Sequence, residues 1–346
     1  MMDDLRILVL CTVEAGLDAV AEVLRHGGRI AGVVGLRPES VNPEVVSGWT
    51  DIGVFCQHWN LPFHYVDRYD LKSKADQALF AALDFNLVWV AGWQRLIPAW
   101  LLEQAAHGAL GAHGSADGIV GGRGRSPQNW ALMLGCRQFD LALFRITPGV
   151  DDGPIVANRS FLIKDTDDIA SSYKKSSLSV AEMVLEVLAQ PELLSQARPQ
   201  RGQVSYYPQR LPEDGFVDWH LGQNDIAAHC RSLSRPYPGL RCIADGGNIT
   251  LWRCRPFDDD LRAPPGSIGA VFNDGSFLVT CGDGRLLVDE WSGPDGWQPQ
   301  SASQLQGKNF GTLLQQIVRR HRKRYPKSKL AARLLNRLAS GGQGEQ

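Results

Sequence analysis

Short apolar runs alternate with longer amphipathic stretches through the first two hundred residues. Five of the apolar runs are typical of buried strands: 7–10, 30–34, 63–66, 87–90 and 109–113. Between them, helical spacing is found in Leu17, Val20, Ala21 and Leu24, in 70–83 and in 98–106. Strands that alternate with helices predict right-handed βαβ units and a mostly parallel sheet covered on both faces, the α/β fold class.

The pattern changes twice along the rest of the chain. β-rich segments at 141–146 and 155–163 and a helix at 168–189 complete a domain of residues 1–194, and the proline-rich stretch 195–212 is typical of a linker. Four strands separated by turn residues then predict an all-β module at 213–305: 249–254, 269–272, 277–281 and 286–290. A basic helical tail, 306–346, follows.

Composition excludes several classes of protein. Of 346 residues, 44% are hydrophobic and 21% charged, which is typical of soluble globular proteins and not of disordered or fibrous chains. The net charge of −1 gives no global attraction to nucleic acid or membrane, although 306–346 holds ten basic residues and one acidic residue. Seven scattered cysteines without a CxxC pair argue against disulfides and a zinc site, so no metal is expected. Without a signal-like or membrane-spanning segment, we expect a cytoplasmic protein.

Two segments carry candidate chemistry. His113 ends an apolar run, and Asp151 and Asp152 lie in the turn TPGVDDGPIV after the run at 141–146. Ligands of open α/β sheets bind beyond strand ends, so the two side chains could converge as a base and its orienting partner. A capping histidine and an Asp-Gly turn are the structural alternative. Glycines 121, 122 and 124 form neither a dinucleotide fingerprint nor a phosphate-binding loop.

Several motifs, in this order, resemble the folate-dependent formyltransferase family. They are VAGWQRLIPAWLL, GAHGS, GRGRSPQNWALMLG and GVDDGPIV, followed by YYPQRLPEDGFVDWH, RPYPG and CGDG. The later three resemble the C-terminal barrel of the methionyl-tRNA and amino-arabinose members, so the resemblance covers about residues 5–305. It implies a Rossmann-like formyltransferase domain, an OB-like β-barrel and 10-formyltetrahydrofolate as formyl donor.

The resemblance also implies roles for individual residues. An amine that attacks a formyl carbon needs a proton acceptor and a donor to the developing oxyanion. His113 matches the family's proton-handling histidine and Asp151 its organising aspartate. The folate ring would lie between the loops Gly92–Pro98 and Ile146–Val150. The implied folate-binding residues are Gly92, Trp93, Leu96, Ile97, Ile146, Val150 and Asp152.

Two departures flank this centre. The family's asparagine should stand two residues before His113, where this chain has Gly111; loss of such a donor costs about 10²–10³ in rate in other enzymes. The loop after Ser115 is also longer and lacks the usual Leu-Leu-Pro. A protonated His113, the Ser115 hydroxyl or a backbone N–H of the glycine loop could replace the amide, although Ser115 equally suits turn capping.

Charged residues bear on which molecule accepts the formyl group. Arg123 and Arg125 are either solvated charges or a grip on a substrate phosphate or carboxylate. A small amine acceptor, such as an amino-sugar nucleotide or an amino-acid-derived metabolite, is favoured because residues 205–305 carry thirteen acidic against eight basic residues. Methionyl-tRNA is the alternative, supported by the basic run 319–329, although we expect that tail to be a solvated helix with a disordered end. A third hypothesis is a folate-binding or formylfolate-hydrolysing protein with a rebuilt site. A homodimer stays open.

Overall fold

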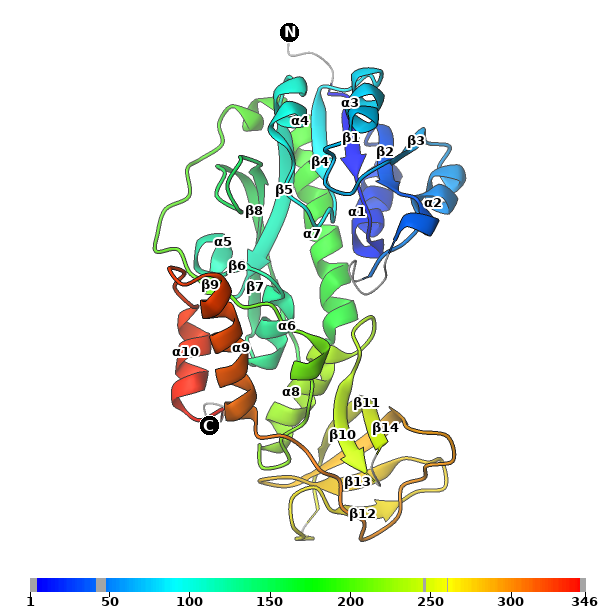
Figure 1. The fold of residues 1–346 in the computed structure, drawn as a ribbon, viewed down its shortest axis with the longest axis vertical. Helices are drawn as coiled ribbons and strands as arrows, with labels where there is room; N and C mark the ends of the chain where they lie inside the picture. The colour runs from blue at the N-terminus through cyan, green and yellow to red at the C-terminus, as the bar shows by residue number, and fades with distance from the viewer. Residues whose placement is uncertain (1–4, 42–47, 245–246, 260, 343–346) are drawn as a thin grey trace. The chain divides into compact units, whose positions relative to one another are not determined.

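The computed structural model describes residues 5–41, 48–244, 247–259 and 261–342. The chain forms two compact units, each built from separate stretches of sequence (Figure 1). The first comprises residues 1–123, 140–161 and 173–203, and the second comprises 124–139, 162–172 and 204–346. The units thus interleave along the chain, whereas the sequence pattern predicted consecutive domains.

A seven-stranded sheet forms the centre of the first unit. Its strands lie in the order β3-β2-β1-β4-β5-β7-β8. Their bounds are β1 (Ile7–Leu10), β2 (Ile30–Leu36), β3 (Phe63–Val66), β4 (Leu87–Val90), β5 (Ala109–Ser115), β7 (Gln138–Arg145) and β8 (Ile155–Leu162). Strands β1 to β5 pair in parallel, whereas β7 is antiparallel to β5. The predicted Rossmann-like, mostly parallel sheet is confirmed.

Burial on both faces explains why the sequence pattern located these strands. Every residue of β1 is buried, and its sequence ILVL contains no polar side chain. Strands β2 and β4 are nearly as enclosed. A strand covered on both faces reads as a continuous apolar run, which is easier to recognise than an alternating one.

Helices surround this sheet, and those at residues 14–25, 74–81, 99–104 and 169–189 lie in the segments that were predicted to be helical. The helices are α1 (Glu14–Arg25), α2 (Ile52–His58), α3 (Lys74–Ala81), α4 (Ala99–Gln104), α5 (Gly118–Gly121) and α7 (Ile169–Ala189), with 3₁₀ turns at Pro38–Ser40 and Pro191–Leu194. Ser73 begins α3 by accepting the backbone N–H of Asp76 at 2.9 Å. Among the described residues, no helix is long and apolar enough to cross a membrane.

The second unit is built on a five-stranded antiparallel sheet. The order is β10-β11-β14-β13-β12, and the bounds are β10 (Leu240–Ala244), β11 (Gly247–Phe257), β12 (Ile268–Val271), β13 (Phe277–Thr280) and β14 (Arg285–Ser292). The predicted C-terminal β module is therefore confirmed. Its unit also contains α6 (Pro127–Met133), α8 (Gln223–Leu233), α9 (Phe310–Arg324), α10 (Ala332–Ala339), a 3₁₀ turn at Pro212–Asp214 and the short strand β9 (Tyr206–Tyr207). Another two-residue strand, β6 (Arg123–Gly124), lies where the units divide.

The basic C-terminal segment belongs to the core of this second unit. Phe310 and Ile317 of α9 and Leu334 of α10 are buried in the same hydrophobic cluster as the sheet. Arg320 forms a 2.5 Å ion pair with the buried Asp214. The expectation of a solvated helix with a disordered end is wrong for α9 and α10, because one face of each helix is apolar and packed.

The stretch predicted as a linker also has fixed contacts. Arg198 and Ile155 exchange two backbone hydrogen bonds, both of 2.8 Å, so the segment pairs with the start of edge strand β8. Residues up to 203 thus belong to the first unit and those from 204 to the second.

Candidate active site

His113 lies on β5 with both ring nitrogens facing acceptor atoms. Its Nε2 is 3.0 Å from the carbonyl oxygen of Gly122, and its Nδ1 is 3.7 Å from Oδ2 of Asp151. A carbonyl oxygen can only accept, so Nε2 carries the hydrogen of that bond. Nδ1 is therefore the atom at which the ring can gain or lose a proton, and a carboxylate stands beside it.

Asp151 reaches His113 from a tight turn between β7 and β8. Its φ of 50° lies in the left-handed region, and a Cβ on Gly153 would lie only 1.7 Å from the carbonyl oxygen of Arg145. The predicted convergence of His113 and Asp151 is present. The predicted reason, two strands ending at one sheet edge, does not apply, because β7 runs antiparallel to β5.

Ser115 holds the loop that carries the Gly122 carbonyl. The residue is fully buried, its hydroxyl donates to the carbonyl of Gly118 at 2.8 Å, and its oxygen accepts the N–H of Asp117 at 3.0 Å. A Cβ on Gly122 would lie 1.8 Å from that oxygen, so only glycine fits there. These contacts are those of the turn-capping alternative.

Gly111 leaves a space that Ile146 fills. A Cβ on Gly111 would lie 3.1 Å from Cδ1 of Ile146 and 3.4 Å from Cζ of Phe144. The N–H of Ile146 donates to Ala109 at 2.8 Å, which fixes its backbone beside β5. A larger side chain at position 111 therefore requires Ile146 to move, and the two residues form a matched pair.

The loop Gly92–Pro98 is held by contacts with Tyr69 and exposes the side chain of Leu96. The N–H of Gln94 donates to the hydroxyl of Tyr69 at 2.9 Å, and the Trp93 ring packs edge-on against Tyr69 at 4.9 Å. Trp93 and Ile97 are buried in the core, whereas Leu96 is 65% exposed. No sequence pattern pointed to Tyr69, because it lies outside every motif.

The Ile146–Val150 loop also has one packed end and one exposed end. Ile146 packs against two apolar clusters of the first unit, whereas Val150 is 49% exposed. Asp152 accepts a hydrogen bond from the Thr147 hydroxyl and thereby closes the turn. Of the apolar residues expected at a folate, Leu96 and Val150 are thus the two that offer their side chains to solvent.

Arg123 and Arg125 differ in burial. Arg123 is 8% exposed, and its Nη2 donates to Oε1 of Gln200 at 2.7 Å, whereas Arg125 is exposed. The Gln200 amide in turn donates to the carbonyls of Asp151 and Gly153, both at 2.8 Å. Arg123 and Gln200 therefore support the turn that presents Asp151. Gln200 was missed because it lies in a stretch whose composition resembles a linker.

The buried cysteines Cys11 and Cys56 do not provide a nucleophile. Burial raises the pKa of Cys11 to about 12, and burial likewise raises the pKa of Cys56 to about 12. The thiolate is the reactive form of cysteine, so both side chains are inert near neutral pH. Within the described ranges, no group of three or more His, Cys, Asp or Glu side chains is placed to hold a metal ion.

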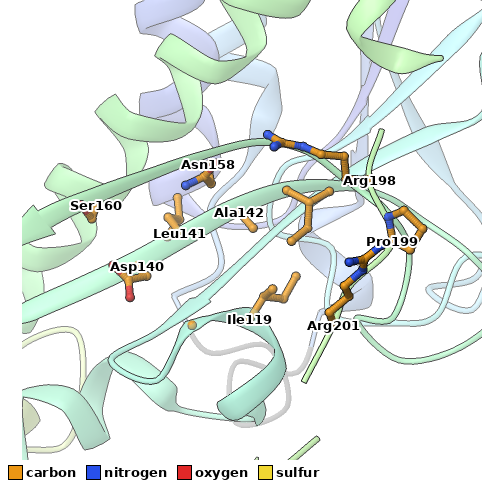
Figure 2. A pocket seen from close by; sticks show the side chains of 11 residues that line it. Ile119, Asp140, Leu141, Ala142, Asn158, Ser160, Arg198, Pro199 and Arg201 are labelled. Carbon is orange, nitrogen blue, oxygen red and sulfur yellow. The ribbon is translucent and has the colours of Figure 1, made fainter. Parts of the chain in front are cut away.

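A cavity of about 750 Å³ lies in the first unit (Figure 2). Its walls come from α5, β7, β8 and the segment 198–201. Ala142, one of its lining residues, pairs directly with His113 in the β5–β7 ladder, so the two side chains point to the same face of the sheet.

Known families match both parts of the chain. The family described as formyl transferase matches residues 56–188, and the formyl transferase C-terminal domain matches residues 211–309. The chain belongs to the formyl transferase family. Methionyl-tRNA formyltransferase of Dechloromonas aromatica is 28% identical over 220 residues, which are 64% of this chain and 69% of that protein.

Several solved structures share the fold at low sequence identity. HypX from Aquifex aeolicus, in complex with tetrahydrofolic acid, superposes with a TM-score of 0.59 at 18% identity and covers 99% of this chain. This chain spans 49% of the length of HypX. The N-formyltransferase from Helicobacter canadensis, in complex with folinic acid and dTDP-3-aminofucose, gives 0.56 at 10% identity, over 82% of this chain and 98% of that enzyme.

Proposed function

We propose that this formyl transferase moves the formyl group of 10-formyltetrahydrofolate to the primary amine of a small acceptor, such as an amino-sugar nucleotide or an amino-acid-derived metabolite. The observation that carries the proposal is the 3.7 Å pair of His113 and Asp151 in a chain of this family. A histidine beside a carboxylate can take the proton that an attacking amine must lose.

The residues of the two flanking loops fit a folate. Leu96 and Val150 expose large apolar side chains, one from each loop, and ligand sites for ring systems are lined mainly by such groups. The backbone of 92–98 and 146–150 supplies donors and acceptors for a pterin edge. When bound, the donor supplies the electrophilic formyl carbon. The folate complexes of HypX and the Helicobacter enzyme support this assignment.

His113 handles the proton at Nδ1. Its Nε2–H is donated to Gly122, so the ring that has gained a proton at Nδ1 has an acceptor at each nitrogen. Asp151 balances the positive charge, and general base catalysis of this kind contributes about 10²–10⁴-fold. We assign Nδ1 to take the proton that the amine loses as its nitrogen bonds to the formyl carbon, and to give that proton to the departing tetrahydrofolate nitrogen as the bond between that nitrogen and the formyl carbon breaks. Ser115 has already committed its hydrogen to Gly118.

A methionyl-tRNA acceptor is the second candidate. Arg319, Arg322, Lys323 and Arg324 are exposed on α9, and a basic surface of this kind suits a phosphate backbone. The 28% identity to a methionyl-tRNA formyltransferase points the same way. The acidic balance of residues 205–305 favours the small acceptor instead.

These candidates are separated without deleting the C-terminal segment, whose Leu330 and Leu334 belong to the core. The triple variant Arg319→Gln, Arg322→Gln and Lys323→Gln removes exposed charge only. Formylation of methionyl-tRNA that falls sharply in this variant favours the tRNA acceptor.

The proposal is tested by following tetrahydrofolate release from 10-formyltetrahydrofolate in the presence of amino-sugar nucleotides, amino acids and charged tRNA. We expect one acceptor class to accelerate release, and His113→Asn to abolish that acceleration. Release without any amine would indicate formylfolate hydrolysis. A wild-type rate equal to that of His113→Asn with every acceptor would contradict the proposal.

A further inference from the structure

We propose that the cavity beside His113 is an anion-binding subsite in which Arg198 and Arg201 grip a phosphate or carboxylate group of a small organic ligand. Its volume of about 750 Å³ suits a metabolite-sized molecule, since ligand pockets span about 300–1,000 Å³. Both arginines line it.

The two guanidinium groups are available to a ligand. In the part of the chain that the structure describes, neither has a hydrogen-bond or ion-pair partner. Other arginines of the first unit are engaged: Arg123 with Gln200, and Arg159 with Glu186 at 2.6 Å. Guanidinium groups match the geometry of carboxylate and phosphate oxygens through paired N–H donors.

The rest of the lining completes a site for an amphipathic molecule. Arg198 and Arg201 come from one side of the cavity, and Asp140 and Ser160 lie on the opposite side (Figure 2). Apolar groups of α5, β7 and β8 lie between them. An apolar middle with a few polar groups at defined positions is the usual composition of a small-molecule site.

Two structural connections join this cavity to the candidate active site. Ala142 lines the cavity and pairs with His113 across the β5–β7 ladder. Gln200, which bonds the Asp151 turn, stands in the chain between Arg201 and Pro199, both of which line the cavity. A ligand held by the arginines would therefore rest on the segment that supports Asp151. The assignment of this ligand as the formyl acceptor rests on the proposed function, whereas anion binding does not.

Arg198 and Arg201 take the role that the sequence suggested for Arg123 and Arg125. Arg123 is buried and used structurally, since its guanidinium donates to Gln200. The cavity is lined instead by arginines from the supposed linker.

Calorimetric titration of the full chain with inorganic pyrophosphate and, separately, with succinate tests the subsite. We expect one of the anions to bind, and Arg198→Gln and Arg201→Gln each to weaken it about tenfold, because a charge-assisted bond is worth roughly one decade in affinity. Binding of pyrophosphate alone indicates a phosphate ligand, and binding of succinate alone a carboxylate. Arg29→Gln, an exposed arginine of the same unit, is the matched control and should bind like the wild type.

A second variant distinguishes the cavity from the surface around it. Ser160→Trp fills the end opposite the arginines without removing charge, and it should also weaken anion binding. The inference is overturned if wild type binds neither anion, or if both arginine variants bind like the control. Titration with 5-formyltetrahydrofolate in parallel separates the two proposals: folate binding without anion binding refutes only the subsite, and anion binding without folate binding refutes only the proposed donor.

Discussion

Nδ1 of His113 lies 3.7 Å from Oδ2 of Asp151, while Nε2 of the same ring is fixed by the carbonyl of Gly122. The carbonyl determines which nitrogen carries the resting hydrogen, so the carboxylate faces the nitrogen that is free to react. Both partners of the ring stand on turns that require glycine, Gly122 beside Ser115 and Gly153 beside Arg145. The position of the ring is therefore specified by backbone packing as well as by side chains.

Gly111→Asn tests whether the site is organised around glycine. Ile146 occupies the adjacent space, so we expect the single substitution to lower formyl transfer about tenfold, through displacement of Ile146. Gly111→Asn combined with Ile146→Ala makes room for the amide, and we expect no gain above wild type. Steady-state kcat/KM of the two variants is the measurement. A gain of about 100-fold in the double variant would mean that an amide donor is missing and not replaced.

Gln200→Ala tests whether the Asp151 turn is held from the segment 198–203. The variant loses two hydrogen bonds to the turn and leaves the buried Arg123 without its acceptor. We expect kcat to fall by about tenfold or more while the KM for folate changes little. A displaced catalytic group lowers the rate of the chemical step without removing contacts that bind the substrate. Gln203→Ala, an exposed neighbour, should be silent. Equal losses in both variants would argue for a general loss of structure.

How far the sequence predicts this site depends on the kind of signal each residue carries. Strands β1, β2 and β4 were located because nearly all their residues are buried and their sequences are continuously apolar. His113 and Asp151 were found through motifs. Arg198 pairs with edge strand β8 and lines the cavity together with Arg201, whereas Gln200 donates to the Asp151 turn. Each of these is a single contact, so it leaves no periodic pattern in the sequence. The antiparallel direction of β7 was likewise invisible, since an apolar run has no preferred direction.

The C-terminal segment gives the converse lesson. Its basic composition suggested solvated structure, but Phe310 and Ile317 follow helical spacing and are buried, while the charges occupy the other face. The spacing of the apolar positions predicts the packing of this segment better than its overall composition does, because a helix can pack on the core through one apolar stripe.

Arg320→Ala should destabilise the second unit. Asp214 is 3% exposed at its side chain and would lose its ion pair while keeping the hydrogen bond from the Leu211 N–H, at a cost of about 2 kcal/mol. Arg319→Ala removes the adjacent, exposed arginine and should change the free energy of unfolding by less than about 0.5 kcal/mol. Urea unfolding of the two variants gives the comparison. Similar small effects in both variants would show that the Arg320–Asp214 ion pair contributes little to the stability of this unit.

The buried His229 should make stability depend on pH. Burial lowers its pKa well below the usual 6.5, so the folded protein keeps the ring neutral while the unfolded chain takes up a proton. Stability is therefore fully present above about pH 6.5 and falls as pH decreases, by up to about 1.4 kcal/mol per pH unit. His229→Gln should reduce the loss of unfolding free energy between pH 7.5 and 5.5. An unchanged pH profile would mean that other groups cause it; His321, whose pKa is also lowered by burial, is the first alternative.

Equilibrium binding of 5-formyltetrahydrofolate tests the account most directly. The folate is stable, and its binding needs no knowledge of the acceptor. We predict that the wild type binds it, that Val150→Ser and Leu96→Ser weaken binding through loss of apolar contact, and that Asp151→Ala weakens it as well, because the aspartate borders the proposed donor site. Arg29→Gln, remote from both loops, should bind like the wild type. Absence of binding to the wild type would contradict the assignment of a formylfolate donor to this site.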